Sequence, residues 1–269
     1  MPGYGTITAQ QLARLIGTPD APALIDVRTD EDFALDPRLL PGARRIAHQF
    51  AASLAPAIGQ RAAIVICQRG RKLSEGAAAL LRIAGTEAEV LDGGWEAACA
   101  ALLPASPADL LPPPGENSLW VTRHRPKIDR IACPWLIRRF IDPGARFLFV
   151  APSEVPAVAD HFGAPPFDVE GVRYTHRGGQ CSFDAFLDDF NLHSPGLDRL
   201  ALVVRGADTD SHDLAPQAAG LLALSVGLSR LYRDDLAQLD AAMPLYDALY
   251  RWARDGFDEG HDWPQGRKP

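Results

Sequence analysis

The sequence predicts an α/β domain with a parallel sheet, followed by a mostly α-helical second domain. Over the first hundred residues, short apolar runs alternate with helix-like segments, and the clearest runs are "ALIDV", "AAIVIC" and "AEVL". Strands of this kind are buried on both faces and are typical of a parallel sheet covered by helices. Further along the chain, strand patterns become rare and long helical patterns dominate.

A proline-rich stretch separates the two regions. "LPASPADLLPPPGENS" contains several prolines and small polar residues, which is typical of an extended, semi-rigid linker. We predict a first domain over 1–105, a linker over 106–118 and a second domain over 119–260. Within the second domain, only "RFLFVAP" and "GVRYTH" have strand patterns. The run 215–232 is apolar nearly all round and should be buried, in the core or at an interface.

Composition excludes several classes of protein. The chain has 269 residues, a hydrophobic content of 47% and a net charge of -7, so we expect packed cores and no general DNA-coating role. We expect no nucleic-acid partner. The N-terminus lacks a basic region followed by an apolar core, and no apolar run reaches the roughly 18 residues of a membrane span. We therefore expect a cytoplasmic protein with no membrane partner and with reduced cysteines.

The strongest chemical signal is a cysteine at the end of a predicted strand. Cys67 follows "AAIVI" and begins a short loop, "CQRGRK", that leads into a helix. Backbone N–H groups at a helix N-terminus concentrate positive potential. Gly70 lets the loop turn, and Arg69, Arg71 and Lys72 add full charges. We expect this setting to lower the thiol pKa below its usual value of about 8.5. The alternative is a small cysteine of the core.

Residues 6 to 103 resemble a rhodanese domain. The resemblance lies in "LIDVR", "PGARRI", "IVICQRGRKLSEGAAALLRIAG" and "VLDGGW". It implies that Cys67 carries a sulfane sulfur as a persulfide and passes it on, with no cofactor required. The partners would be small sulfur donors and thiol acceptors. The implied substrate cradle consists of Gln68, Arg69, Gly70, Arg71 and Lys72.

The length of the loop favours sulfur over phosphate as the transferred group. In the family that this region resembles, sulfurtransferases have a cation five residues after the cysteine. Related phosphatases and arsenate reductases have an arginine six residues after it. Here Lys72 is at the fifth position and Leu73 at the sixth. Lysine lacks the planar fork that an arginine offers to an oxyanion. We therefore expect thiosulfate to be a poor donor and a persulfide to be the true one.

The start of the second region is dense with cations. "WVTRHRPKIDRIACPWLIRRFIDP" suggests either an anion-binding surface or a solvated helix face. Pro134 fits the first turn of a helix, which would put Cys133 at the N-cap and lower its pKa. The site candidates in this stretch are Asp129, Arg130 and Cys133.

A second group of side chains has the chemistry of metal ligands. Histidine, thiolate and carboxylate suit a transition metal such as zinc, iron or manganese, although the spacing matches no strong signature. The alternative is a set of hydrogen-bonded structural residues. The candidate ligands are His176, Cys181, Asp184 and Asp208.

From about 119 to 255 the chain resembles the C-terminal domain of the chromate-resistance protein B (ChrB) family. The resemblance lies in "WVTRHRPKIDRIACPWLIRRFIDP", "FDVEGVRYTHRGGQCSFDAFL" and "VVRGADTDSHDLAPQAAGLLALSVGLSRLYRDD". It implies a link to chromate resistance. Our leading hypothesis is a sulfurtransferase that works through Cys67. The alternatives are a sensor that binds chromate or a similar oxyanion, and a metal-dependent redox-defence protein.

Overall fold

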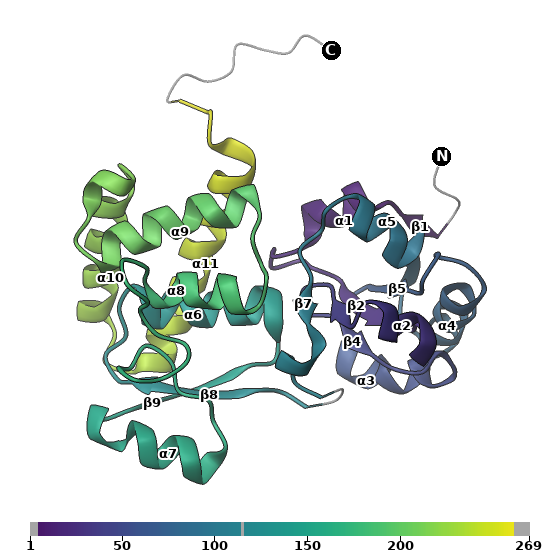
Figure 1. The fold of residues 1–269 in the computed structure, drawn as a ribbon, viewed down its shortest axis with the longest axis horizontal. Helices are drawn as coiled ribbons and strands as arrows, with labels where there is room; N and C mark the ends of the chain where they lie inside the picture. Colours follow the sequence, from purple (N-terminus) through teal and green to yellow (C-terminus); the bar gives the residue numbers. More distant parts are fainter. Residues whose placement is uncertain (1–4, 114–115, 261–269) are drawn as a thin grey trace.

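The computed structural model describes residues 5–113 and 116–260, and it begins with a parallel sheet (Figure 1). The strand order is β1 (Thr6–Ile7), β6 (Ala88–Leu91), β5 (Ala63–Ile66), β2 (Ala23–Asp26) and β4 (Arg44–Arg45). The helices of this unit are α1 (Ala9–Leu15), α2 (Asp30–Leu35), η1 (His48–Leu54), α3 (Ala55–Ile58), α4 (Lys72–Ile83) and α5 (Gly94–Ala100). All the strand pairs of this sheet are parallel, as the apolar runs predicted.

Each face of the sheet is covered by its own helices. Successive side chains of a strand point to opposite faces. Leu24 and Ile64 lie in one hydrophobic cluster with residues of α1 and α5, whereas Ile25 and Val65 lie in another with residues of α4. Helices on both faces are what wholly apolar strands require. The predicted α/β class is therefore confirmed for the first unit.

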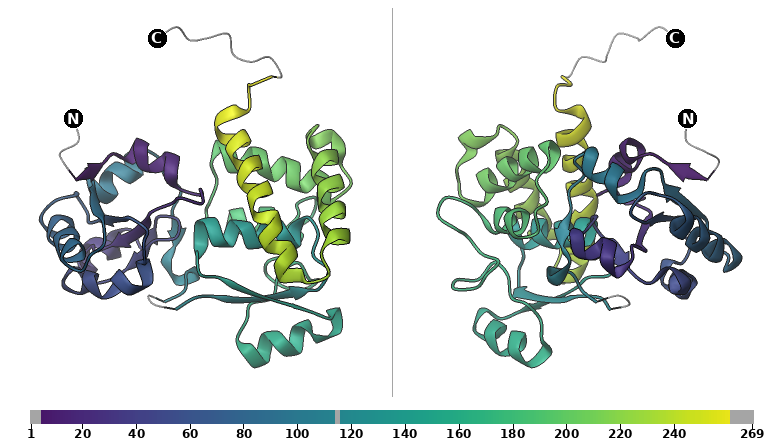
Figure 2. Two further views of the ribbon diagram at one scale, coloured as in Figure 1. Left: turned by 180° about the vertical axis from the view of Figure 1, so that it is seen from behind. Right: turned by 45° about the vertical axis from the view of Figure 1, so that its right-hand side comes forward.

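The second unit is mostly helical and has one pair of parallel strands, β8 and β9. Helix α7 lies on one side of this pair, and the other long helices lie on the opposite side (Figures 1 and 2). The elements are β8 (Leu119–Arg123), α6 (Asp129–Leu136), β9 (Arg146–Val150), α7 (Val155–Phe162), α8 (Ser182–Asp189), α9 (Pro195–Asp208), α10 (Ala218–Leu231) and α11 (Asp235–Arg251). A π-helical segment, η3 (Ile137–Ile141), continues α6.

Two predictions about the second unit were wrong. "GVRYTH" forms no strand; it makes one isolated bridge, between Tyr174 and Phe167, because the chain turns at Gly171 with a φ of +80°. The run 215–232 is not buried all round. One side of α10 is exposed, with Leu224 at 53% and Leu231 at 78% accessibility, because α10 packs on α9 and α11 with its other side only.

The predicted linker is largely packed against the two units. Ser106 and Pro107 form strand β7 (Ser106–Pro107), which pairs antiparallel with β3 (Arg38–Leu39) of the first unit. A short 3-10 turn, η2 (Ala108–Leu110), follows. Residues 114–115 of the predicted linker lie outside the described residues.

The two units share one hydrophobic core. The cluster that holds the α1 and α5 side of the sheet continues into the aromatic core of the second unit. At the junction, the Gly42 N–H donates a hydrogen bond of 2.9 Å to the carbonyl of Phe140. Arg44 of β4 pairs with the fully buried carboxylate of Asp142 at 2.9 Å. These contacts hold the end of η3 against the first unit.

The junction has a sharp steric requirement at Gly17. This residue has a φ of +77°, and a Cβ atom there would overlap the ring of Phe140. We predict that Gly17→Ala destabilises the protein by about 1–3 kcal/mol beyond the cost of the backbone conformation, because overpacking a fixed contact displaces the ring. Urea unfolding measures this difference.

The matched control is Gly59→Ala. Gly59 also has a positive φ, +64°, but no atom lies within 4 Å of the position that its Cβ would take. It should therefore carry the backbone cost alone. Equal losses of stability in the two variants would contradict the contact with Phe140.

Candidate functional site

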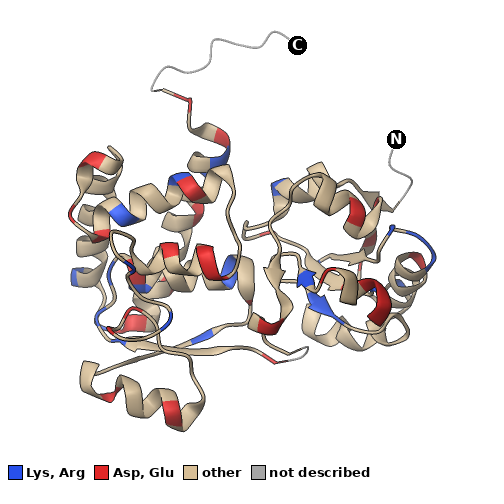
Figure 3. Cartoon of the chain, in the orientation of Figure 1, with Lys and Arg blue, Asp and Glu red and all other residues tan. Residues whose placement is uncertain are grey.

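Cys67 lies immediately after β5 and begins the cysteine loop, residues 67–72. Parallel strands end at the same edge of a sheet, which is where reactive groups of such folds gather. The cysteine is 4% exposed, and its side chain packs beside the apolar residues of the α4 face. Helix α4 begins at Lys72, directly after the loop. The loop lies at the edge of the molecule away from the second unit. Its basic residues form a blue segment beside α4 in Figure 3.

Hydrogen-bond donors surround the sulfur atom. The Arg71 N–H donates to Sγ at 3.3 Å, and the hydroxyl of Ser74 lies 3.1 Å from Sγ. Burial raises the pKa of the Cys67 thiol, but the Ser74 hydroxyl and the N–H groups of Arg71, Ser74 and Arg69 outweigh burial and lower that pKa. The direction of the shift agrees with the prediction. The thiolate is thus stabilised at a nearly buried position.

The main-chain N–H groups act as we expected, but the cations of the loop do not lead. The groups that lower the pKa are the Ser74 hydroxyl, which we did not foresee, and main-chain N–H groups of the loop and the helix start. The side chains of Arg71 and Lys72 are exposed, and Arg69 pairs with Glu96 of α5 at 3.1 Å. Ser74 was missed because it follows the loop. The sequence did contain a sign of it, because Ser74 is a polar residue at the third position of the helix that begins at the end of the loop.

The neighbouring loop "DGGW" fixes the shape of the cysteine loop. The Trp95 N–H donates to the carbonyl of Cys67 at 2.9 Å, and a Cβ on Gly94 would overlap that carbonyl. Gly70 has a φ of +63°, and a Cβ there would overlap the carbonyl of Leu91. Both glycines are needed because two main-chain segments touch. The amide groups are therefore held in place before any substrate binds.

Asp26 and Arg28 form a buried structural pair beside the loop. Both are nearly inaccessible, and their ion pair spans 2.8 Å. The guanidinium also donates to the carbonyls of Asp36 and Arg38 and lies 3.9 Å from the ring of Trp95. The Arg28 guanidinium thus packs against Trp95 of the "DGGW" loop and helps to hold that loop in place. No hydrogen bond or ion pair joins this pair to Sγ among the described residues.

A second cluster of titratable side chains lies in the helical unit. The carboxylate cluster consists of Asp129, Asp168, His176 and Asp208. Asp129 is the first residue of α6, Asp208 is the last residue of α9, and the other two belong to the irregular segment between α7 and α8. Asp129, His176 and Asp208 can each place one ligand atom within 4.8 Å of the other two.

Electrostatic repulsion within this cluster is strong. Burial raises the pKa of Asp129 well above its usual range, and Asp208 and Asp168 raise it further. Burial and Asp168 also raise the pKa of Asp208. The cations nearby act on Asp168, which pairs with Arg123 at 2.9 Å and with Arg130 at 3.2 Å.

The backbone beside the cluster is strained. Ile128, which precedes Asp129, has a φ of +38°, a conformation that a β-branched residue rarely adopts and that costs about 1–3 kcal/mol. Hydrogen bonds on both sides hold it: its N–H donates to Ser225, and its carbonyl accepts from Tyr246. Strain of this kind concentrates at functional sites and fixes the start of α6.

Several predicted site residues lie elsewhere. Cys133 is not an N-cap, because α6 begins at Asp129; the thiol is fully buried, and burial raises its pKa well above the usual value. Burial also raises the pKa of Cys181. Asp184 caps the Cys181 N–H and forms a bidentate pair with Arg205. Of the predicted ligands, the structure brings His176 and Asp208 together and adds Asp129 to them. Metal binding itself stays a prediction.

The cations of the "WVTRHRPKIDR…" stretch do not converge on one surface. Arg123 and Arg130 hold Asp168, as described above. Arg138 pairs with Asp240, and Arg139 forms a bidentate pair with Asp247. Binding of an oxyanion by this stretch stays a prediction that no contact here favours.

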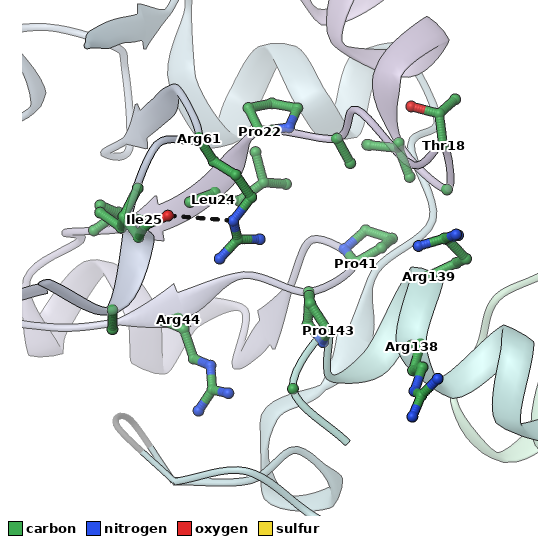
Figure 4. A pocket seen from close by; sticks show the side chains of 18 of the residues that line it. Thr18, Pro22, Leu24, Ile25, Pro41, Arg44, Arg61, Arg138, Arg139 and Pro143 are labelled. Atoms are coloured by element: carbon green, nitrogen blue, oxygen red, sulfur yellow. Dashed lines mark hydrogen bonds between the residues drawn. The ribbon is translucent and has the colours of Figure 1, made fainter. Parts of the chain in front are cut away.

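A cavity of about 540 Å³ lies between the two units (Figure 4). Four arginines line it, but three of them have carboxylate partners; Arg61, whose Nε donates to the carbonyl of Ile58, has no such partner among the described residues. The cavity reaches the start of β2, whereas Cys67 lies at the carboxyl edge of the same sheet. Cys67 does not line this cavity.

Within the part of the chain that the structure describes, every helix is too short or too polar to cross a bilayer.

Comparisons with known proteins assign both units to families. Residues 8–101 match the family model "Rhodanese-like domain", and residues 120–253 match "ChrB, C-terminal domain". Protein ChrB of Cupriavidus metallidurans is 38% identical over 132 residues, which are 49% of this chain and 39% of that protein. The chain thus spans about two-fifths of the length of that relative. Both predicted resemblances are confirmed.

Solved structures similar to the chain include two that cover the first unit. One is a thiosulfate sulfurtransferase from Pseudomonas aeruginosa, 26% identical over 41% of this chain and 21% of that chain, with a TM-score of 0.36. The other is a rhodanese-like domain protein from Staphylococcus aureus, 25% identical over 36% of this chain and 91% of that chain, with a TM-score of 0.30.

We predict that Ser74→Ala raises the pKa of Cys67, because the variant loses a hydrogen bond to the thiolate while burial is unchanged. The thiolate absorbance near 240 nm, followed against pH, measures this. The Cys67→Ala spectrum is subtracted to isolate the one thiol. In the wild type the absorbance should rise at a lower pH than in Ser74→Ala. The control is Lys72→Gln, which should shift the curve less; a larger shift in that variant would contradict the assignment.

Proposed function

Because the chain joins a rhodanese-like domain to a ChrB C-terminal domain, we propose that it is a sulfur carrier and sulfurtransferase. The Cys67 thiolate attacks the outer sulfur of a donor persulfide. The sulfur–sulfur bond of the donor breaks, and the donor leaves as a thiolate. The Cys67 persulfide is then attacked at its outer sulfur by an acceptor thiolate, and Cys67 returns to its starting state. The two steps balance without an oxidant or reductant.

One observation carries this proposal: the Arg71 N–H donates to Sγ, the Ser74 hydroxyl lies within hydrogen-bonding distance of it, and these groups lower the thiol pKa despite burial. A cysteine of an inert core has no such donors, and burial alone raises the pKa of such a thiol. Cys133 is an example within the same chain. The donors suit both anions of the cycle, the thiolate and the persulfide.

The donor is a persulfide rather than thiosulfate. Thiosulfate carries a sulfonate group that a planar guanidinium binds in a bidentate manner. At the fifth position of the loop this chain has Lys72, whose side chain is exposed and offers a single ammonium group. The loop is therefore suited to stabilise a negatively charged sulfur atom, but it should bind an oxyanion weakly.

The acceptor is a separate molecule that approaches from solvent. The cysteine loop lies beside α4, on the side of the first unit away from the helical unit, in every view of the fold (Figures 1 and 2). The cavity between the units reaches the opposite edge of the sheet. Transfer within the chain to the carboxylate cluster would require a large movement across a continuous hydrophobic core. A small thiol or a second protein meets no such obstacle.

The ChrB C-terminal domain connects this chemistry to chromate resistance, as the family resemblance implies. An oxyanion sensor has less support, because each of Arg123, Arg130, Arg138 and Arg139 already contacts a carboxylate. Releasing Arg123, Arg130 or Arg139 from its partner would leave the mostly buried carboxylate of Asp168 or Asp247 uncompensated. We therefore place the activity in the first unit.

We predict that the purified full chain transfers sulfur from glutathione persulfide to cyanide, and that Cys67→Ala abolishes this transfer. Thiocyanate formation measures the activity. The matched control is Cys99→Ser, which removes the exposed thiol and should retain the wild-type rate. Equal rates for Cys67→Ala and the wild type, after subtraction of the uncatalysed rate, would refute the proposal.

The variant Lys72→Arg tests which molecule is the donor. It should raise kcat/KM for thiosulfate about tenfold, the effect of roughly one added charged hydrogen bond. The rate with the persulfide donor should stay nearly unchanged.

A further inference from the structure

The carboxylate cluster brings together four residues from three separate segments of the helical unit. Its members are the first residue of α6, the last residue of α9 and two residues of the segment between α7 and α8. The Nε2 atom of His176 lies 3.0 Å from Asp208 and 3.6 Å from both Asp129 and Asp168. The imidazole therefore faces three carboxylates at once, which is more than one hydrogen-bonded pair needs.

The separations match those of ligands around one ion. Two atoms that are each about 2.1 Å from a metal lie roughly 3.0 Å apart at a right angle and roughly 4.2 Å apart when opposite. The distances of His176 to Asp208 and Asp129 fall within that range, and the three ligand atoms all lie within 4.8 Å of one another.

A buried oxygen atom without a partner points independently to a ligand. Asp129 is fully buried, and its Oδ2 atom accepts a hydrogen bond from the Ser182 N–H. Its Oδ1 atom has no hydrogen-bond partner among the described residues. Leaving a buried carboxylate oxygen unpaired is costly, so such atoms normally have an unseen water or ion as partner. The other oxygen of the same carboxylate, Oδ2, lies 3.6 Å from His176 Nε2, so the unpaired oxygen is on a side chain of the cluster.

The charges of the cluster are not balanced by the protein. Arg123 and Arg130 both bind the Oδ2 atom of Asp168. Asp168 Oδ1 also accepts from the hydroxyl of Ser182. Neither arginine forms an ion pair with Asp129 or Asp208 among the described residues, so these two carboxylates have His176 as their shared basic neighbour. A divalent cation would neutralise this pair of carboxylates, with which neither arginine forms an ion pair.

We propose that Asp129, His176 and Asp208 bind one divalent transition-metal ion through His176 Nε2 and one oxygen of each carboxylate. One imidazole nitrogen and two carboxylate oxygens suit Mn²⁺, Fe²⁺ or Zn²⁺ better than Mg²⁺ or Ca²⁺, which prefer oxygen ligands alone. Cys181 and Asp184 are not ligands; the first is buried beside Asp129, and the second is held by Arg205. The site is independent of the sulfur chemistry at Cys67.

The test is Mn²⁺ binding to the full chain after removal of metals with a chelator and desalting. The electron paramagnetic resonance signal of free Mn²⁺ falls as the ion binds, which gives stoichiometry and affinity without any activity assay. We expect one Mn²⁺ per chain for the wild type. Both His176→Ala and Asp208→Asn should weaken binding at least tenfold, since even outer-sphere changes at metal sites cost 10- to 100-fold. Zn²⁺ should compete with Mn²⁺ for the site, and Mg²⁺ should compete poorly.

The matched control is His193→Ala. His193 lies in the same unit, is similarly exposed and also contacts two aspartates, Asp188 and Asp198, but lies outside the carboxylate cluster. This variant should bind Mn²⁺ as the wild type does. His176 is half-exposed, so His176→Ala should fold, and circular dichroism checks this. Absence of binding at millimolar Mn²⁺ and Zn²⁺, equal binding by His176→Ala and the wild type, or a preference for Mg²⁺ would each overturn the proposal.

Discussion

The chemistry of the first unit depends on how the protein solvates one buried sulfur atom. Burial alone would keep Cys67 a neutral core thiol. The Ser74 hydroxyl and the main-chain N–H groups of the loop reverse that preference, and the thiol pKa falls. These donors are dipoles fixed by close contact with the "DGGW" loop at Gly70 and Gly94, so no reorganisation is needed when charge appears on sulfur. Arg71 and Lys72 of the loop are exposed to solvent.

One helical segment ties the second unit together and joins it to the first. Asp129 at its start belongs to the carboxylate cluster, and Trp135 in its middle lies among the rings of Phe140, Phe183, Tyr246 and Tyr250. At its end, Phe140 and Asp142 meet Gly17, Gly42 and Arg44 of the first unit. The cluster and the junction are therefore connected by one mostly buried helical segment, whereas the cysteine loop lies on the far side of the sheet.

Local patterns predicted the sheet and the cysteine loop because the strands and the loop each have a short, recognisable sequence pattern, although their contacts join distant segments. The apolar runs specify buried parallel strands, and "CQRGRK" after such a run specifies an anion cradle. The helical unit was harder, since no such pattern marks its contacts. Pro134 suggested a helix start, but packing of Ile131, Trp135 and Leu136 in the core continues the helix back to Asp129. His176 and Asp208 were named correctly as neighbours, whereas Asp184 was claimed by Arg205, a pairing that no spacing in the sequence reveals.

The central claim is that Cys67 holds a covalently bound sulfur atom between donor and acceptor. The most direct measurement is mass spectrometry of the full chain after one treatment with glutathione persulfide in the absence of an acceptor, followed by alkylation and peptide mapping. The account predicts one added sulfur on the peptide that contains Cys67, removed when a thiol acceptor is supplied. An added sulfur found only on Cys99, or none on any cysteine, would contradict it.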